Sequence, residues 1–524
     1  MVSYCRSSAA ADLVASSNIQ KVLNFILIGM TVAVDHVIIG YIRCAKGEVI
    51  MKSEPGLDIT REQELAKLSF DEAPKIVSDV LPGPKSQKLI DTELENETVT
   101  RVVPNVLPVV WERAKGATVQ DPDGNYFIDL TAGIAVNNVG HCNPGVLETI
   151  KKQSGMLMHN PDATNYHRVK LGQKLQQIAP GKLKGNVKMA YGLSGSSAVE
   201  IAAKFAKSAT GKSHIIAFEG AYHGALGATL SLTTSPQFRS DYGPFHPYVY
   251  HVGPYAYCYR CPWKLEHPQC GLECARYVEH LLLGPYTGID IDNVAAMIVE
   301  PVQAEGGYVT PPDGFLSAIK KTCEKAGILY IDDEVQAGMG RTGKMFAIEH
   351  YGVDPDIITL GKALGGDLPF SAVIIENSIA EKLSPISHIL TAAGNATTCA
   401  VACTNIDLLQ DGLVERAEKL GEYAKEVLEG MMEEIEIIGD IRGKGFMIAI
   451  ETVKDRDTKE PVDMGEMMQI VWSLRDKGVL MLPCGRYNNV FRLMPPLVIT
   501  RKHLDRALEI IGDVFKQVQG DILK

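Results

Sequence analysis

A lysine among small residues is the first feature of this chain that could do chemistry. Lys362 stands in Thr359-Leu-Gly-Lys-Ala-Leu-Gly-Gly366, directly after the apolar run Ile357 to Leu360. A lysine at the end of a strand can reach into a cleft, where its amine can act as a nucleophile or a base. A lysine in such a loop is more often simply solvated, so the residues around it decide the interpretation.

Acidic residues follow a second apolar run. Ile328 to Ile331 predicts a strand, and Asp332, Asp333 and Glu334 come directly after it, with Gln336 close behind. The carboxyl ends of parallel strands are where open α/β sheets bind ligands.

The same acids could instead hold magnesium in a nucleotide hydrolase. The only matching phosphate loop would end in Gly211-Lys212-Ser213, but that segment ends a predicted helix and precedes a strand. A phosphate-binding loop must follow a strand and open a helix, so nucleotide hydrolysis is disfavoured.

A better anion site is Gly192-Leu-Ser-Gly-Ser-Ser-Ala198. It follows the short run Val187 to Ala190 and opens a predicted helix that runs to about Ser208. Free backbone amides at a helix start, with hydroxyls beside them, bind phosphate well. The bare pattern is also compatible with a serine-rich helix cap.

The secondary-structure elements that must position these residues are predicted helices and strands that alternate along the chain. Between residues 145 and 390, helical periods alternate with short apolar runs, which predicts a large domain with a mostly parallel sheet flanked by helices. Amphipathic segments in 391–524, such as Val401 to Glu434, predict a smaller α/β domain. Residues 51–144 are expected to form an N-terminal arm and part of that small domain, with a hairpin turn at Asp121-Pro-Asp-Gly124.

Residues 1–50 are expected to be a non-native or disordered extension. The codons of Gly47-Glu48-Val49 can spell a ribosome-binding sequence just before Met51, which suggests a misassigned start. The apolar run Val22 to Val34 is too short to span a bilayer, so no membrane association is predicted.

Composition narrows the class of partner. A net charge of −11 argues against nucleic-acid binding through the overall field and favours small-molecule substrates. Most of the 11 cysteines resemble buried small hydrophobes, which fits a reducing cytoplasm. Four are clustered with spacing that could suit zinc or disulfides, or neither: Cys258, Cys261, Cys270 and Cys274. No metal is assigned.

The order of phosphate loop, strand-end acid and loop lysine resembles that of fold type I pyridoxal-phosphate enzymes. The details, from about Pro82 to Val518, resemble the class III aminotransferases, related to 4-aminobutyrate, ornithine and acetylornithine aminotransferases. Asp333, Lys362 and Thr391 are each 29 positions apart, as is usual in that family. The other matching motifs are Gly133-Ile-Ala-Val136, Gly140-His141, Tyr222-His-Gly224, Glu300-Pro-Val-Gln-Ala-Glu305-Gly-Gly307, Asp333-Glu-Val-Gln336, Gly340-Arg-Thr-Gly343, Gly394-Asn395 and Arg492-x2-Pro-Pro496.

The resemblance implies roles around pyridoxal 5'-phosphate. Lys362 would hold the cofactor as a Schiff base and carry protons, while Asp333 would keep the pyridine nitrogen protonated. The remaining cofactor contacts implied are Gln336 at the phenolic oxygen, Tyr222 stacked on the ring, Gly195 and Ser196 at the phosphate, and Thr391 at the phosphate of the partner subunit. A homodimer or higher homo-oligomer would follow from the last contact.

For the substrate, Arg492 matches an arginine that grips the carboxylate of α-amino acids. Glu305 matches a glutamate that neutralises this arginine when the donor is an ω-amine, and the resemblance also assigns Glu300 and Ile134 to the substrate. Relatives that use 4-aminobutyrate often have an arginine where this chain has Ala225. Ser197 and Ala396 are two further departures, at positions that usually hold an acid and a proline.

The predicted function is therefore transfer of an amino group from an ω-amino acid, of the 4-aminobutyrate or ornithine type, to 2-oxoglutarate. The alternative is an amino-acid racemase or epimerase on the same fold, because some such relatives carry a similar cysteine-rich stretch. A catalytically silent binding protein is a third possibility, against which Lys362 and Asp333 argue.

Overall fold

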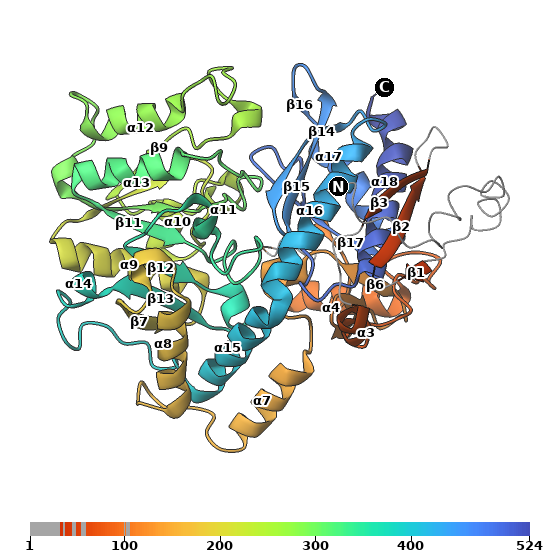
Figure 1. Ribbon diagram of the computed structural model, residues 1–524, viewed down its shortest axis with the longest axis horizontal. Coiled ribbons are helices and arrows are strands. Elements are labelled where there is room, and N and C mark those ends of the chain that lie inside the picture. The colour runs from red at the N-terminus through yellow and green to blue at the C-terminus, as the bar shows by residue number, and fades with distance from the viewer. Residues whose placement is uncertain are drawn as a thin grey trace, which may run out of the picture. The chain divides into compact units, whose positions relative to one another are not determined.

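The computed structural model describes residues 32–34, 37–43, 49–53, 59–98, 100 and 105–523 (Figure 1). Its contacts divide the chain into two units, Met1–Glu64 and Leu65–Lys524. The first unit contains an antiparallel sheet of β1 (Val32–Val34), β2 (Val37–Arg43) and β3 (Val49–Ser53). Part of the extension predicted over residues 1–50 therefore has strand backbone, while residues 1–31 lie outside the described residues.

A chain that begins at Met51 tests the prediction that the extension is not native. It would lose β1 and β2 entirely, but every residue of the candidate site lies in the second unit. We expect this shorter chain to fold and to turn over like the full chain, measured by thermal unfolding and steady-state rates. A large loss of activity or solubility would instead make the segment a functional part of the protein.

The second unit is built on a seven-stranded sheet in the order β7-β13-β12-β11-β10-β8-β9. Only β13 runs antiparallel to its neighbours, β12 and β7, so the sheet is mostly parallel as predicted. The strands are β7 (Val187–Gly192), β8 (His214–Phe218), β9 (Val249–Val252), β10 (Val294–Val299), β11 (Leu329–Asp333), β12 (Ile357–Leu360) and β13 (Ser371–Glu376).

Helices cover both faces of this sheet, and Figure 1 shows α12 and α13 above the strands and α8 below them. Ser194 caps α9 with a reciprocal capping box, and Gly211 ends that helix at φ 71°, so Gly211-Lys212-Ser213 does follow a helix. The helices of this part are α7 (Pro144–Ser154), α8 (Tyr166–Ile178), α9 (Gly195–Thr210), α10 (Gly227–Leu232), α11 (Pro236–Arg239), α12 (Glu273–Leu283), α13 (Phe315–Ala326), α14 (Asn377–Ala380) and α15 (Ala396–Leu408).

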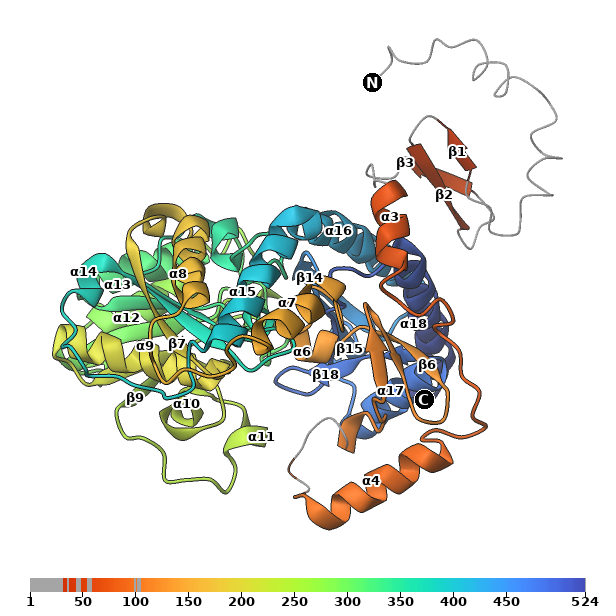
Figure 2. The ribbon, with the colours of Figure 1, turned by 90° about the horizontal axis from the view of Figure 1, so that it is seen from below.

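Two smaller sheets complete the unit (Figure 2). One is antiparallel: β14 (Ile438–Lys444), β15 (Met447–Asp455), β19 (Val490–Leu493) and β18 (Leu482–Cys484), with β16 (Glu460–Pro461) on β15. The other joins β17 (Val479–Leu480) to β6 (Tyr126–Asp129), β5 (Thr118–Gln120) and β4 (Arg113–Lys115). The helices in the same parts of the sequence as these two sheets are α3 (Ile59–Ala66, shared with the first unit), α4 (Pro84–Asn96), α6 (Ala132–Ala135), α16 (Val414–Met431), α17 (Met464–Asp476) and α18 (Arg501–Ile522).

The predicted hairpin turn at 121–124 does connect two antiparallel strands, β5 and β6. The single amphipathic segment predicted over Val401 to Glu434 is instead two helices, α15 and α16. They are separated by a turn over Leu409–Leu413, where Gly412 has a φ of 86° that no ordinary helix allows. The domain boundaries at residues 144 and 390 stay predictions.

No helix in the described part of the chain is both long and apolar enough to cross a membrane.

Candidate active site

The candidate catalytic residues meet at one edge of the large sheet. Asp333 is the last residue of β11, Lys362 follows β12 by two residues, and Glu300 directly follows β10. The three strands are adjacent and parallel, so their carboxyl ends lie together. The structure therefore brings together, at one edge, the acids and the lysine that the sequence predicts at the ends of strands.

Asp333 is held in a fixed orientation by three hydrogen bonds. Its carboxylate accepts hydrogen bonds from the hydroxyl of Thr359 (2.9 Å) and the backbone N–H of Val335 (3.2 Å), and its second oxygen lies 2.7 Å from Nδ1 of His223. The Asp333 residue is only 4% exposed. A buried carboxyl group supported in this way is held in one orientation.

His223 is a residue that sequence reasoning missed. It is buried, and its Nε2 atom has no hydrogen-bond partner in the described structure. It stands in the Tyr222-His-Gly224 motif, so the motif was a signal that something was positioned there. Its contact with Asp333 makes it a positioning residue for that carboxylate.

Lys362 lies in the middle of this group and is partly buried. Burial lowers its pKa from 10.5 to about 8, and the nearby charge of Arg492 lowers the pKa further, whereas Glu305, Glu300 and Asp333 oppose the shift. The backbone at Lys362 has a φ of 41°, an unusual conformation that is common at functional sites. An amine with such a pKa has a much larger uncharged fraction near neutral pH than an ordinary lysine, and the uncharged form is the nucleophile.

Capture of the cofactor by the apoprotein should therefore depend on pH. Only the neutral amine of Lys362 can attack an aldehyde, and because its pKa is lowered to about 8, half of the amine is neutral near that pH. We expect the capture rate, followed by absorbance, to be half-maximal near pH 8 and to level off well above it. A rate that keeps rising in parallel with ordinary lysine ionisation, near 10.5, would contradict the lowered pKa.

The predicted phosphate loop packs against the lysine turn. Gly195 begins α9, and a Cβ atom at this position would lie 2.7 Å from Cγ1 of Val335. A Cβ at Gly361 would in turn lie 3.2 Å from Gly195, and one at Gly224 would overlap the hydroxyl of Ser196. The amide-rich start of a 16-residue helix thus lies beside both Lys362 and the Tyr222 motif.

Tyr222 and Gln336 lie at the same site. The backbone N–H of Tyr222 donates to Glu300 (2.9 Å), and burial raises the pKa of its phenol to about 12, which keeps the ring neutral. The side-chain oxygen of Gln336 accepts a hydrogen bond from the hydroxyl of Tyr308 (3.0 Å). The amide N–H groups of Gln336 are then left to donate, as the predicted contact with a phenolic oxygen requires.

Arg492, which is buried, and Glu305, which is partly buried, form an ion pair with an Nη1 to Oε1 distance of 2.5 Å. Arg492 also donates to the carbonyl of Pro483 (3.0 Å). Burial lowers the pKa of Arg492, but the charge of Glu305 outweighs it and raises the pKa above its usual range. Burial raises the pKa of Glu300 to about 7, although it accepts hydrogen bonds from the backbone of Tyr222 and Ala304.

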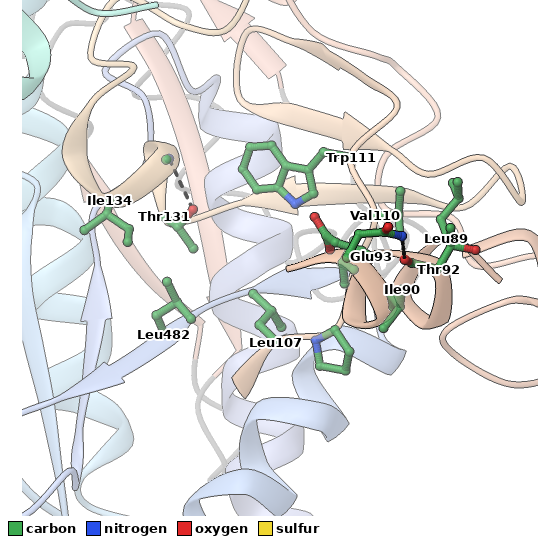
Figure 3. Close-up of a pocket in the computed structure, with 14 residues that line it drawn as sticks. Leu89, Ile90, Thr92, Glu93, Leu107, Val110, Trp111, Thr131, Ile134 and Leu482 are labelled. Atoms are coloured by element: carbon green, nitrogen blue, oxygen red, sulfur yellow. Dashed lines mark hydrogen bonds between the residues drawn. The ribbon is translucent and has the colours of Figure 1, made fainter. Parts of the chain in front are cut away.

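Ile134 lies in α6, a short distorted turn, and has a φ of 65°. That conformation is an outlier for a β-branched residue and marks a constrained position. Ile134 lines a cavity together with residues of α4 and the segment that follows it (Figure 3). Thr391 is exposed in a turn before α15, and its predicted contact with a partner's phosphate stays a prediction.

The four clustered cysteines are all free thiols. Burial raises the pKa of Cys274 to about 11, and the nearby Cys258 and Cys270 contribute to the shift. Within the part of the chain that the structure describes, no group of three or more His, Cys, Asp or Glu side chains is arranged to hold a metal ion.

The residues gathered at this edge fit pyridoxal phosphate. The start of α9 suits a phosphate, Asp333 suits a protonated ring nitrogen, and Lys362 suits a carbonyl carbon. A Cβ at Gly195 or Gly361 would crowd this cradle, which explains why glycines stand there.

Comparison with known proteins agrees with this assignment. The family model described as aminotransferase class-III matches residues 99–515. A leucine/methionine racemase of Thermococcus litoralis is 39% identical, covering 79% of this chain and 93% of the relative. A 4-aminobutyrate aminotransferase of Mycobacterium bovis is 36% identical, covering 84% of this chain and 98% of the relative.

Among solved structures, ornithine aminotransferase of Toxoplasma gondii, with pyridoxal phosphate at partial occupancy in its active site, matches at a TM-score of 0.72. It is 27% identical, and the match covers 89% of this chain and all of that one. The chain therefore belongs to the class III aminotransferase family: it is an α/β enzyme of fold type I whose cofactor is pyridoxal phosphate.

Proposed function

We propose that this enzyme moves an amino group from an ω-amino acid, of the 4-aminobutyrate or ornithine type, to 2-oxoglutarate. The ion pair of Arg492 with Glu305 is the observation that carries the proposal. In one half-reaction such an enzyme binds a dicarboxylate, and a free arginine must then bind one of the carboxylates. In the other half-reaction it binds an ω-amine, and the charge of the same arginine must then be neutralised. An ion pair whose acid can turn away satisfies both demands.

The cofactor, when bound, acts as an electron sink for the substrate carbon next to the amine. Lys362 removes the proton from that carbon and can return it at a different atom, because its lowered pKa makes it both an effective acid and an effective base near neutral pH. Asp333 would hold a proton on the ring nitrogen of the bound cofactor, and His223 keeps the Asp333 carboxyl group in place. Gln336 and Tyr222 would orient the ring.

Replacing Glu305 by alanine tests this proposal. Glu305→Ala leaves the buried Arg492 unpaired and facing the apolar body of an ω-amine, while binding of glutamate needs no such neutralisation. We expect transition-state binding of ω-amine donors to weaken by about 1 to 3 kcal/mol relative to glutamate. Steady-state kcat/KM with ornithine, 4-aminobutyrate and glutamate measures the difference.

Glu418→Ala provides the control, since Glu418 forms an ion pair with Lys344 at an exposed position. It should leave all three rates unchanged. An equal loss with glutamate and the ω-amines in Glu305→Ala would exclude the neutralising role.

A racemase or epimerase is the second candidate, favoured by the 39% identical leucine/methionine racemase. Racemisation returns the proton to the opposite face of the α carbon and produces no oxo acid. Chiral analysis of leucine incubated with the loaded enzyme, without any oxo acid, separates the two reactions. Rapid loss of optical purity under these conditions would overturn the aminotransferase proposal.

We further propose that the enzyme works as a homodimer in the cytoplasm. Thr391 is exposed, as a residue that contacts a partner subunit must be, and buried thiols such as Cys323 and Cys484 suit a reducing compartment. Sedimentation of the wild type and of Thr391→Ala, together with cofactor retention, tests the shared site.

A further inference from the structure

Glu305 belongs to a tight turn with an unusual backbone. Gln303 and Val309 close the turn by exchanging backbone hydrogen bonds of 3.1 and 2.9 Å. Inside it, Gly307 has a φ of 119° and Tyr308 has a φ of 49°, and the second value is uncommon for a residue with a side chain. Strained backbone of this kind persists only where its surroundings hold it.

The side chain that holds this turn is Arg442 in β14, which pairs with β15 (Figure 1). Its Nη2 and Nε atoms donate to the carbonyls of Gly307 (2.5 Å) and Tyr308 (3.2 Å). A guanidinium group has five N–H donors in a rigid planar fork, so one arginine can hold two successive carbonyls at once. A Cβ atom at Gly307 would lie 3.3 Å from Nη2 of Arg442, so the turn and the guanidinium group are closely packed.

The other donors of Arg442 are bound by groups outside the turn. Nη1 donates to Asp440 and Glu451, at 2.6 Å each, and Nη2 also donates to the hydroxyl of Tyr257 (3.0 Å). That hydroxyl in turn donates to Glu451, whose other oxygen accepts a hydrogen bond from Arg260 (2.5 Å). Glu451 is fully buried. Each N–H donor of the guanidinium group therefore has an acceptor, which fixes its orientation toward the turn.

The turn carries two side chains that serve the reaction. Glu305 pairs with Arg492, and Tyr308 donates to Gln336, the predicted partner of the cofactor's phenolic oxygen. The backbone N–H of Gly485 also donates to the carbonyl of Glu305 (2.9 Å). With its backbone held in this way, Glu305 can leave Arg492 by rotation of its own side chain. A turn that is ordered in advance also avoids the entropy cost of ordering it each time the pair forms again.

We propose that Arg442 is a positioning residue that determines which amine donors the enzyme uses. By fixing the turn, it keeps Glu305 opposite Arg492, so that the arginine is neutralised whenever no substrate carboxylate binds there. The donor class rests on the proposed function, which assigns this neutralisation to the ω-amine half-reaction. Arg442 acts on the donor through Glu305.

Replacing Arg442 by lysine keeps the charge and removes the planar fork. An ammonium group cannot hold two successive carbonyls and two carboxylates in the same geometry. With the holoenzyme, we expect the ratio of kcat/KM with 4-aminobutyrate to kcat/KM with glutamate to fall about tenfold. Arg456→Lys is the matched control, because Arg456 also donates to backbone carbonyls, but to those within residues 432–438. It should leave the ratio unchanged, whatever its effect on thermal unfolding.

A double-mutant cycle shows whether Arg442 acts through Glu305. Glu305→Ala removes the group that the turn positions, so Arg442→Lys added to it should change the ratio by less than about twofold. Two independent effects would multiply instead, and that result would refute the proposal. An unchanged ratio in the single variant Arg442→Lys would refute it as well.

Tyr257→Phe is a milder variant that answers the same question if Arg442→Lys does not fold. It removes a hydroxyl that accepts from Arg442 and donates to Glu451, whereas the guanidinium carbon still lies over the ring, 4.8 Å from its centroid. We expect the ratio to fall about two- to threefold, and to stay constant when Glu305 is already alanine. A ratio equal to that of the wild type would then count against the positioning role.

Binding of glutarate separates this proposal from the proposed function. Glutarate has no amine and cannot react, and one of its carboxylates must displace Glu305 from Arg492. Calorimetry with the holoenzyme should show that glutarate binds to Arg442→Lys about three- to tenfold more tightly than to the wild type, because a loosely held acid competes less well. If no ω-amine reacts with the wild type, the proposed function fails, and glutarate alone decides. Equal affinities for the two proteins would then overturn the positioning role of Arg442.

Discussion

Lys362→Ala should abolish turnover, with a fall in kcat of about 10⁴-fold or more. The substitution removes the amine that links to the cofactor and the group that carries the substrate proton. Lys362 follows the end of β12 at this edge, so we expect no other lysine to replace it. The start of α9 and Asp333 remain intact, so the variant should still retain some cofactor without a covalent link.

Borohydride reduction of the holoenzyme followed by peptide mapping locates the covalent link. The label should appear on the peptide that contains Lys362, and label on any other lysine would refute the assignment. Lys207→Ala is a suitable control, because burial also lowers the pKa of that lysine although it lies at the other end of α9. Its rates should match those of the wild type.

Asp333→Asn should lower kcat by about 10²- to 10³-fold. Asparagine keeps the size of the side chain but removes the negative charge that stabilises a protonated ring nitrogen. The hydrogen bonds from Thr359 and His223 were oriented toward a carboxylate, and one of the asparagine's two polar ends can only donate. Steady-state kinetics and thermal unfolding separate loss of function from loss of fold.

The neighbouring acid provides the control for this experiment. Asp332 is fully buried, and neither of its carboxyl oxygens has a hydrogen-bond partner in the described structure. Burial, with the charges of Glu334 and Asp333, raises the pKa of Asp332 well above the usual range, which favours its neutral form. Asp332→Asn should therefore be nearly silent, and a loss as large as that of Asp333→Asn would contradict the importance of the charge at 333.

Local sequence patterns were sufficient to predict the large sheet and to place several candidate residues at one of its edges. Apolar runs such as Ile357 to Leu360 and the helix that begins at Gly195 are continuous in sequence, and the side chains that follow each strand project at one edge. Lys362 and Asp333 could be singled out because each lies at or just after the end of such a run, whereas the roles of Tyr222, Gln336 and Thr391 were named only from the family resemblance and stay predictions.

Other features depend on contacts between distant segments and left little trace in the local pattern. β13 is as apolar as its parallel neighbours, so its reversed direction is set by pairing with β7 and β12. The N-terminal arm predicted within residues 51–144 contains the helix α4, which the polar sequence did not predict. This helix forms one wall of the cavity beside Ile134, although it is far in sequence from Leu482, which also lines the cavity. The bond between His223 and Asp333 likewise joins residues that lie 110 positions apart.

The division of the site between two sheets has a consequence for how such enzymes diverge. Lys362 and Asp333 belong to the large parallel sheet, whereas Arg492 and Leu482 belong to the antiparallel sheet built from the C-terminal segment. Mutations in the second sheet can exchange one amine substrate for another while the residues that activate the cofactor remain untouched. Gene lineages can therefore acquire new substrates repeatedly without first losing catalysis, which fits a family whose members include both racemases and aminotransferases.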